Sequence, residues 1–233
     1  MTSTPSELSR FRLVSVPGRP GRDFAWASLY DNAYEFWKAF WSEVYGQAGS
    51  PQSFVKEDFM RQDEIRCLLR DDEIVGMQTH TAFDLERPAT RDHRYFAFYT
   101  PEFYAALAAR GVRHVSSTEF LAVAPKWRRA SAEVPALFEI LIGCSAKDFL
   151  ARGMDAGIGC GRRDVKVSEA TTRWGFQKIQ EHVVRRNFEC DLVACFPETI
   201  RRHPDFEINR WTEELWNRRL DASVPAVAAR RAA

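Results

Sequence analysis

Residues 114–133, HVSSTEFLAVAPKWRRASAE, carry the strongest indication of the fold of this chain. Its first part is typical of a β-strand that ends at Pro125. From Val134 to Gly153, apolar residues recur at helical spacing. A strand that leads into a long helix presents unpaired backbone N–H groups and the positive end of the helix dipole to an anion. We therefore take this junction, Val123–Glu133, as the first candidate site.

The junction also carries positive charge and small side chains. Lys126, Arg128 and Arg129 supply the charge, and the small residues at 130–132 allow a phosphate to come close to the backbone. These features predict a cradle for a phosphate or pyrophosphate, while an ordinary strand–helix loop with solvated basic side chains is the alternative. The residues expected to bind such a group are Ala122, Val123, Arg128, Arg129, Ala130, Ser131 and Ala132.

Strand and helix patterns alternate on both sides of this junction. The sequence predicts strands at 11–16, 63–70, 73–83, 114–125, 155–160, 176–186 and 187–196. It predicts helices at 25–45, 134–153, 164–174 and 209–219, and a short helix capped by Ser50 or Ser53. Asp71-Asp72 is the connection of an antiparallel hairpin. The predicted fold class is α/β, with a mixed, mostly antiparallel central sheet flanked by helices.

Residues 85–113 interrupt this pattern, and we expect them to form an insertion before the fourth core strand. YFAFYT at 95–100 is typical of a short strand, and PEFYAALAARG at 101–111 is typical of a helix. The expected organisation is a single domain over residues 1–220, closed by the terminal helix and followed by a disordered tail at 221–233.

The composition excludes several classes of protein. With 233 residues, 45% apolar and 28% charged, the chain is not disordered, collagenous or a coiled coil. Lys plus Arg number 33 against 32 Asp plus Glu, so the net charge of +1 creates no global field for a polyanion, and we expect no nucleic-acid partner. No apolar run reaches the roughly 18 to 20 residues of a membrane span, and the N-terminus lacks the apolar region of a signal peptide. Five widely spaced cysteines favour reduced thiols, so we expect a soluble, cytoplasmic protein.

Two motifs then give a resemblance to a known family. The junction opens with V-x-P-x-x-R at Val123, Pro125 and Arg128, and the helix at 164–174 runs into W-G-F at 174–176. With the order of elements, these motifs resemble the GNAT superfamily of acyltransferases over roughly residues 11–196. In that family, the fourth strand and the following helix bind the pantetheine and pyrophosphate of an acyl carrier through an R/Q-x-x-G-x-G/A loop. The resemblance implies a GNAT-like fold and, as cofactor, acyl-coenzyme A or the acyl-phosphopantetheine of acyl carrier protein.

The chain departs from the family pattern at several positions. Ser131 and Glu133 stand where the loop has its two small residues, and the charge of Glu133 would repel a pyrophosphate. Thr171 stands where the family often has a tyrosine that protonates the leaving thiolate, and Asp164 stands where it often has an asparagine. These departures are tolerated in one branch, the acyl-homoserine-lactone synthases and the similar long-chain N-acyl amino acid synthases.

Three features resemble that branch: an aromatic first helix, the acidic stretch KEDFMRQDE at 56–64, and Glu119 in TEFLAV on the fourth strand. The lactone synthases show E-x-x-R on that strand. Ala122 occupies the arginine position here, which argues against lactone synthesis and leaves the general N-acyltransferase interpretation.

The resemblance implies an N-acyltransferase that moves an acyl group from coenzyme A or acyl carrier protein to a small-molecule amine. Transfer by direct attack in a ternary complex is expected. Acyl carrier protein is acidic and would be steered by a set of basic residues: Lys126, Arg128, Arg129, Arg162 and Arg163. Two alternatives remain open, a non-catalytic GNAT-like module that binds acyl groups or cofactor, and a plain acetyltransferase that acts on a protein or a small amine.

Glu119 is the predicted catalytic base. An amine must lose a proton to attack a thioester, and burial on a central strand can raise the pKa of a carboxylate enough to accept that proton. By strict alternation, Glu119 shares a face with Leu121 rather than with Phe120. Backbone N–H groups near Val123, where the strand splays from its neighbour in GNAT folds, are expected to stabilise the oxyanion. The alternative role for Glu119 is a structural ion pair with a neighbouring Arg or Lys.

The helix at 25–45 carries an aromatic stripe. Burial of an acyl chain contributes roughly 0.8 kcal/mol per methylene, so a long-chain enzyme needs a deep apolar slot. Tyr34, Trp37 and Trp41 of this stripe, with Phe54 or Phe59, are predicted to line that slot. The residues predicted to contact substrate here are Trp37, Trp41 and Phe120. The alternative is that the stripe is simply core.

GIGCG at 157–161 resembles a glycine-rich nucleotide loop, although it lacks the full G-x-G-x-x-G spacing. Arg162 and Arg163 follow it and are predicted to bind substrate through charge-assisted hydrogen bonds. Cys160 beside them is either a thiol of lowered pKa or an inert one. The five histidines are scattered and no His or Cys pair has zinc-ligand spacing, so no metal is expected.

Overall fold

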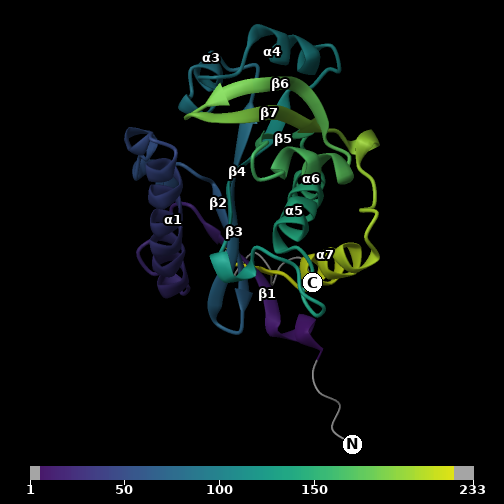
Figure 1. Cartoon of the computed structure of the whole chain (residues 1–233). Coiled ribbons are helices and arrows are strands. Elements are labelled where there is room, and N and C mark those ends of the chain that lie inside the picture. The colour runs from purple at the N-terminus through teal and green to yellow at the C-terminus, as the bar shows by residue number, and fades with distance from the viewer. Residues whose placement is uncertain (1–5, 223–233) are drawn as a thin grey trace, which may run out of the picture.

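The computed structural model describes residues 6–222, and these form one mixed eight-stranded sheet flanked by helices (Figure 1). The strands lie in the order β6-β7-β5-β4-β3-β2-β1-β8. They are β1 (Phe11–Pro17), β2 (Glu64–Arg70), β3 (Glu73–Asp84), β4 (His114–Val123), β5 (Ala156–Arg162), β6 (Gln177–Arg185), β7 (Phe188–Cys195) and β8 (Leu220–Asp221). The helices are α1 (Ala27–Gln47), α2 (Glu57–Met60), α3 (Pro88–Arg91), α4 (Pro101–Ala108), α5 (Leu137–Ala151), α6 (Val167–Arg173) and α7 (Phe206–Asn217).

Strand pairing is mostly antiparallel, as the sequence predicts. Strands β1 to β4 are successive antiparallel neighbours, and β7 pairs antiparallel with β5 and β6. Strands β4 and β5 are parallel because α5 crosses between them, and β8 runs parallel to β1. The predicted hairpin at Asp71-Asp72 joins β2 to β3. The predicted fold class, including the insertion before the fourth core strand, is confirmed.

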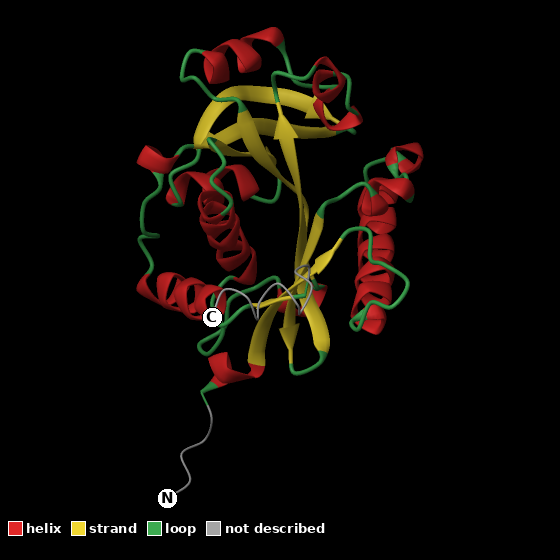
Figure 2. Cartoon of the chain, turned by 180° about the vertical axis from the view of Figure 1, so that it is seen from behind, coloured by secondary structure: helices red, strands yellow, loops and turns green. Residues whose placement is uncertain are grey.

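Helices cover both faces of the sheet (Figure 2). Helix α1 lies on one face, where Trp37 and Trp41 join an apolar cluster with strand residues such as Cys67 and Met77. Helices α5, α6 and α7 lie on the other face and build a second cluster around Leu141. The ends of β4 and β5 therefore lie between α1 on one face of the sheet and the helices of the other face.

The insertion at 85–113 forms an aromatic cluster, and the predicted strand at 95–100 is wrong. Arg94–Phe96 is a 3-10 turn whose Tyr95 and Phe96 rings pack on Phe83 of β3. Large rings can be buried from a turn as well as from a strand, so an apolar run alone does not distinguish the two. The predicted helix that follows is present as α4, with the Thr100 side chain accepting a hydrogen bond from its first turn.

The C-terminal prediction needs two corrections. Helix α7 begins at Phe206, three residues earlier than expected, because Asp205 caps it with two accepted N–H bonds. Asp221 belongs to β8 beside β1, whereas residues 223–233 of the predicted tail lie outside the described residues. No helix within residues 6–222 is long and apolar enough to cross a membrane.

A buried ionic network fixes α5 against the sheet. Arg66 of β2 lies 2.5 Å from Glu64 and 2.6 Å from Asp148 of α5, and Arg152 bonds the same two carboxylates. Burial opposes ionisation of Asp148, but His80, Arg66 and Arg152 hold its pKa low, at about 2. These ion pairs fix the position of α5, the helix that forms one wall of the candidate site.

Helices α5 and α6 meet through the W-G-F motif. The Trp174 indole N–H donates to the Glu139 carbonyl oxygen over 2.9 Å, and its ring lies against Gly143 of α5. Gly175, with φ +95°, follows the end of α6, as predicted. The position requires glycine, because a Cβ there would lie 2.0 Å from the Thr199 carbonyl oxygen.

Replacement of Gly143 by Ala is expected to destabilise the protein by about 1–3 kcal/mol, because the added Cβ would lie 2.4 Å from the Trp174 ring. Gly46→Ala in α1 is the matched control, since no atom lies within 4 Å of its added Cβ. The control is expected to be neutral or stabilising by up to about 1 kcal/mol. Urea unfolding of both variants checks this, and equal stability of the two would contradict the packing.

Candidate functional site

The strands β4 and β5 part halfway along their length. Their parallel ladder covers four residue pairs, from Val115↔Ala156 to Thr118↔Gly159. Beyond this point β4 continues to Val123 and β5 continues to Arg162, but the two strands no longer pair with each other. This is the predicted splay, and it creates an opening in the plane of the sheet.

An irregular residue in β4 sits at the start of the opening. Phe120 has φ +50°, a conformation that a bulky side chain rarely adopts, and the β3–β4 register shifts between Met77 and Thr79. The Phe120 ring contacts Trp37 and Trp41 on the α1 side, whereas Leu121 packs into the α5 cluster. The backbone therefore breaks its alternation where the strands separate.

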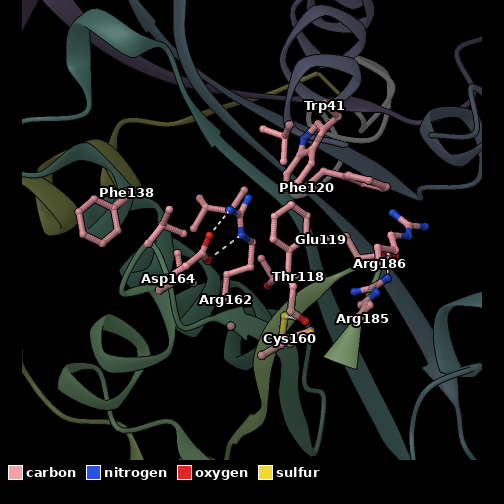
Figure 3. A pocket seen from close by; sticks show the side chains of 18 of the residues that line it. Trp41, Thr118, Glu119, Phe120, Phe138, Cys160, Arg162, Asp164, Arg185 and Arg186 are labelled. Atoms are coloured by element: carbon pink, nitrogen blue, oxygen red, sulfur yellow. Dashed lines mark hydrogen bonds and ion pairs between the residues drawn. The ribbon is translucent and has the colours of Figure 1, made fainter. Parts of the chain in front are cut away.

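A cavity of about 640 Å³ fills the opening (Figure 3). Its walls come from α1, from the facing ends of β4 and β5, from α5 and α6, and from the β6–β7 turn. The apolar lining includes Phe40, Trp41, Val44, Phe120, Leu121, Phe138, Ile142, Val167, Phe176 and Phe188. The ionisable lining includes Glu43, Glu119, Arg128, Cys160, Arg162, Asp164, Arg185 and Arg186. A volume of this size and a largely apolar wall suit a small-molecule ligand.

Glu119 lies at the floor of this cavity with only 6% of its surface exposed. Burial raises its pKa, while Arg185, whose guanidinium is 3.6 Å from the carboxylate, opposes that rise. Gln62 donates a hydrogen bond to Oε1 over 3.5 Å. Because of the conformation of Phe120, Glu119 lies on the same face as Phe120, not Leu121, which corrects the alternation argument.

Cys160 lies on β5 across the opening from Glu119 (Figure 3). A hydrogen bond from Cys190 lowers its pKa to about 7, with burial opposing and Arg185 assisting. Of the five free cysteines, all in the described part of the chain, Cys160 is partly exposed and the other four are buried. The sequence left open whether this thiol is activated, and the structure gives it the surroundings of an activated one.

The glycines around Cys160 do not form a nucleotide loop, which corrects that resemblance. Residues 157–161 lie within β5, where Gly157 packs on the Phe149 ring and Gly161 on the backbone of Ser168. A Cβ at Gly161 would lie 2.9 Å from the Ser168 Cα atom. These glycines therefore allow helices to approach the strand closely.

Two arginines at the β6–β7 turn complete the polar end of the cavity, and the sequence analysis did not identify them. Arg185 stacks its guanidinium on the Phe98 ring at 4.0 Å. Arg186 bonds the Tyr45 hydroxyl and lies 3.0 Å from Asp58. The only sequence signal was the dipeptide itself before the turn residue Asn187, and that does not show which cavity a turn faces.

The predicted phosphate cradle is only partly at the cavity. Val123 and Arg128 line it, and Arg128 donates to the Val123 carbonyl oxygen over 3.2 Å. Ala122 lies buried on the α1 side, and Arg129, Ala130, Ser131 and Ala132 are exposed outside the lining. Helix α5 begins at Leu137, later than the sequence predicts.

Ser131 uses the backbone of this loop internally. Its Oγ accepts hydrogen bonds from the N–H groups of Glu133 and Val134, and its own N–H donates to the Val134 carbonyl oxygen. These three groups are therefore occupied by the protein itself. The remaining capacity for an anion comes from Arg128 and Arg129 and from the start of α5 at Leu137.

The predicted substrate residues separate into two groups. Trp41, Phe120 and Arg162 line the cavity, whereas Trp37 is fully buried core and Arg163 lies outside the lining, paired with Asp191 at 2.8 Å. The Trp41 side chain is 8% exposed, and its indole N–H has no hydrogen-bond partner within residues 6–222.

Arg162 is held by its neighbours at the cavity wall. It makes two hydrogen bonds with Asp164, and its guanidinium stacks on the Phe188 ring at 3.7 Å. Thr171 also lines the cavity, and its hydroxyl donates to the Ser168 carbonyl oxygen over 2.7 Å. In the described part of the chain, no cluster of three His, Cys, Asp or Glu side chains is arranged to hold a metal ion.

Comparison with known proteins identifies this architecture. No family model and no curated protein sequence matches the chain. Among solved structures, it is similar to FeeM, an N-acyl amino acid synthase from uncultured soil microbes, with a TM-score of 0.52 and 12% identity over 81% of this chain and 92% of that one. It is also similar to BjaI, a CoA-dependent acyl-homoserine lactone synthase solved with SAM and isopentyl-CoA, with a TM-score of 0.55 and 12% identity over 95% and 98% of the two chains.

An agmatine N-acetyltransferase is a third similar structure, with a TM-score of 0.55 and 12% identity over 79% of this chain and 97% of that one. The fold is thus that of the GNAT acyltransferases, and the predicted resemblance to the synthase branch is confirmed at the level of structure.

Cys160 is expected to react with iodoacetamide at pH 7 at least about ten-fold faster than the other cysteines, because it alone combines partial exposure with a lowered pKa. Burial raises the pKa of Cys67 and Cys144 to about 12, so these two serve as internal controls. Peptide mass spectrometry after brief labelling measures the rates. Labelling of Cys67 or Cys144 before Cys160 would contradict the arrangement of the cavity.

Proposed function

We propose that the protein is an N-acyltransferase that moves an acyl group from a phosphopantetheine thioester to an amine. The observation that carries this proposal is the cavity at the β4–β5 opening, which places a buried carboxylate and main-chain groups beside an apolar space. The similar solved structures, which include an N-acyl amino acid synthase and acetyltransferases, support this class of reaction.

The donor thioester would enter between β4 and β5. Between Phe120 and Val123, β4 no longer pairs with β5, so main-chain N–H groups on this edge of β4 can stabilise the oxyanion of the tetrahedral intermediate. Arg128 in the lining and the exposed Arg129 next to it would offer charge to the phosphates of coenzyme A or of acyl carrier protein. The two carriers share this phosphopantetheine chemistry.

The apolar lining suits the acyl chain. Aromatic and aliphatic side chains from α1, β4 and α5 line the cavity, and each methylene buried there contributes about 0.8 kcal/mol. We therefore propose a donor with a chain longer than acetyl.

Glu119 is the proposed base. Its raised pKa brings the carboxylate closer to the basicity needed to accept a proton from an attacking amine, and the charge of Arg185 opposes that rise. The amine attacks the thioester carbon directly, and the Glu119 carboxylate receives the proton as the new C–N bond forms.

A non-catalytic acyl-binding module is the second candidate. The internal use of the loop N–H groups by Ser131 favours it, because a pyrophosphate at that loop would find fewer free donors. Binding without turnover would identify such a module.

One experiment separates the two. Release of free thiol is measured with acyl-coenzyme A and acyl-acyl carrier protein of several chain lengths, against a panel of amines, beside thermal-shift measurements with the same donors. Amine-dependent thiol release and an amide product would support the transferase. Stabilisation by donors with no thiol release from any pair would support the module instead.

Glu119→Gln is expected to lower turnover by about 10²-fold or more, because the amide cannot accept the proton. In the unmodified protein, turnover should fall as pH drops through the pKa of Glu119, which burial raises from its ordinary value. The variant should lack this limb of the pH profile. Donor binding by thermal shift controls for folding, and full turnover by the variant at every pH would refute the assignment.

Val44→Trp is expected to shorten the preferred acyl chain, because a larger ring would occupy part of the lined cavity. Loss of room for one methylene should lower kcat/KM for the longer donor by roughly four-fold, the equivalent of 0.8 kcal/mol. Ala39→Trp, on the same helix but exposed and outside the lining, is the control. An unchanged chain-length profile in Val44→Trp would exclude this wall from the acyl site.

A further inference from the structure

Any transfer from a thioester leaves a thiolate that needs a proton. When an amine attacks, the C–S bond breaks and its electron pair remains on sulfur. An alkyl thiol has a pKa of about 8.5, and a low-dielectric cavity disfavours the anion further. A group that donates a proton at this sulfur therefore accelerates the step.

Four hydroxyl groups line the cavity, and each is engaged within the protein. The Ser145 hydroxyl donates to Gln78 over 2.9 Å, and the Thr118 hydroxyl lies 3.5 Å from a His80 ring nitrogen. The Thr171 hydroxyl donates its proton to the Ser168 carbonyl oxygen. The Tyr45 hydroxyl accepts a hydrogen bond from Arg186, and burial raises its pKa. The Thr171 proton is thus taken by a carbonyl oxygen, and the raised pKa makes the Tyr45 phenol a weaker acid.

Cys160 of β5 follows Gly159, the last residue of β5 that pairs with β4. It is part of a cluster, since Glu119, Arg185 and Cys190 line the same cavity around it. Figure 3 shows its sulfur below Thr118 and Glu119, at the point where the two strands separate.

Like Trp37 and Trp127 outside the cavity, Trp41 has an unpartnered indole N–H among the described residues, and a ligand in this cavity could accept a hydrogen bond from it. Its side chain lines the same space, is more than nine-tenths buried, and has no acceptor within the described residues. A buried donor without a partner costs stability unless a bound molecule provides one.

We propose that Cys160 is the general acid that protonates the departing carrier thiolate. This rests on the proposed acyl transfer. As the tetrahedral intermediate collapses, the Cys160 proton moves to the carrier sulfur, and the amine proton moves to the Glu119 carboxylate. The products are the amide and the free carrier thiol. The proton then returns from Glu119 to the Cys160 thiolate, directly or through water, so each turnover consumes no net proton.

The groups that face Cys160 suit a thiol that gives and regains a proton. Arg185 of β6 stabilises the thiolate by its charge, and the Cys190 thiol of β7 donates a hydrogen bond to it. Glu119 of β4 and the neutral phenols of Tyr95 and Tyr99 in the insertion oppose the thiolate or leave it unchanged. The balance lowers the pKa of Cys160 to about 7, with the Cys190 hydrogen bond as its largest cause.

The test compares donors that differ in their need for a proton. The same acyl group is presented as a thioester of pantetheine and as a thioester of thiophenol, whose thiolate is a much weaker base and leaves without protonation. Cys160→Ala is expected to lose about 10²-fold in turnover with the pantetheine thioester and less than about three-fold with the aryl thioester. Cys160→Ser, whose hydroxyl is a weaker acid, should show the same pattern.

The pH profile provides a second readout. With an acceptor amine that stays neutral over the range, turnover of the pantetheine thioester should fall above pH about 7 as Cys160 loses its proton. This limb should be absent in Cys160→Ala and absent for the aryl thioester. Cys195→Ala, a buried cysteine of β7 outside the cavity lining, is the control and should keep the limb.

Each outcome bears on the proposal. Selective loss with the pantetheine thioester would support it. Equal loss with both donors, no loss with either, or a hydroxylamine-labile acyl adduct on Cys160 in mass spectrometry would overturn it, and acyl transfer itself would still stand. Absence of thiol release from the unmodified protein with every donor would overturn acyl transfer and the role of Cys160 together.

Discussion

The conformation of one residue, Phe120, is the constraint on which the site depends. A positive φ at a bulky residue costs about 1–3 kcal/mol, and here it is offset by the ring's burial against Trp37 and Trp41. The irregularity places Glu119 and Phe120 on one face and Leu121 on the other. In a regular strand, Phe120 would lie on the face opposite Glu119, away from Trp37 and Trp41. The aromatic stripe of α1 therefore belongs both to the core and to the site. It packs against Phe120, the residue whose conformation shapes the opening.

Two buried carboxylates differ in the number of hydrogen-bond donors that the fold gives them. Asp191 accepts short hydrogen bonds from Arg163 and Ser168, and these partners hold its pKa far below the usual range. Glu119 has one cation at 3.6 Å and one amide donor at 3.5 Å, and its pKa is raised by burial. The difference lies in how many close donors each carboxylate receives. A carboxylate with incomplete partners retains basicity that a reaction can use.

The sequence predicted the fold well because the signals that determine it are local. The alternation of strand and helix patterns, the hairpin at Asp71-Asp72 and the helix stop at Gly175 depend on neighbouring residues, and all three are present. The site was harder to predict because it depends on register. Arg185 was missed because the direction of a residue at the end of a strand follows from strand pairing. Residues 157–161 were misassigned because close helix packing selects the same glycines as a loop does. Rings such as Tyr95 are buried by tertiary contacts that the local pattern does not encode.

The loop after β4, whose N–H groups are bonded within the protein, and the large cavity both bear on how a donor would bind. Where Ser131 takes the loop's N–H groups, the phosphates of a carrier lose some of the donors that a glycine-rich loop would offer. An apolar cavity of about 640 Å³ can replace that binding energy, since eight buried methylenes contribute about 6 kcal/mol. Under the proposed acyl transfer, such a protein would discriminate between donors by the length of the acyl chain more than by the carrier's phosphates. It would also need its own acid and base within the cavity, because an apolar wall around the thioester would exclude the water that otherwise exchanges protons. Cys160 and Glu119, on opposite strands of the opening, are the residues proposed for these roles.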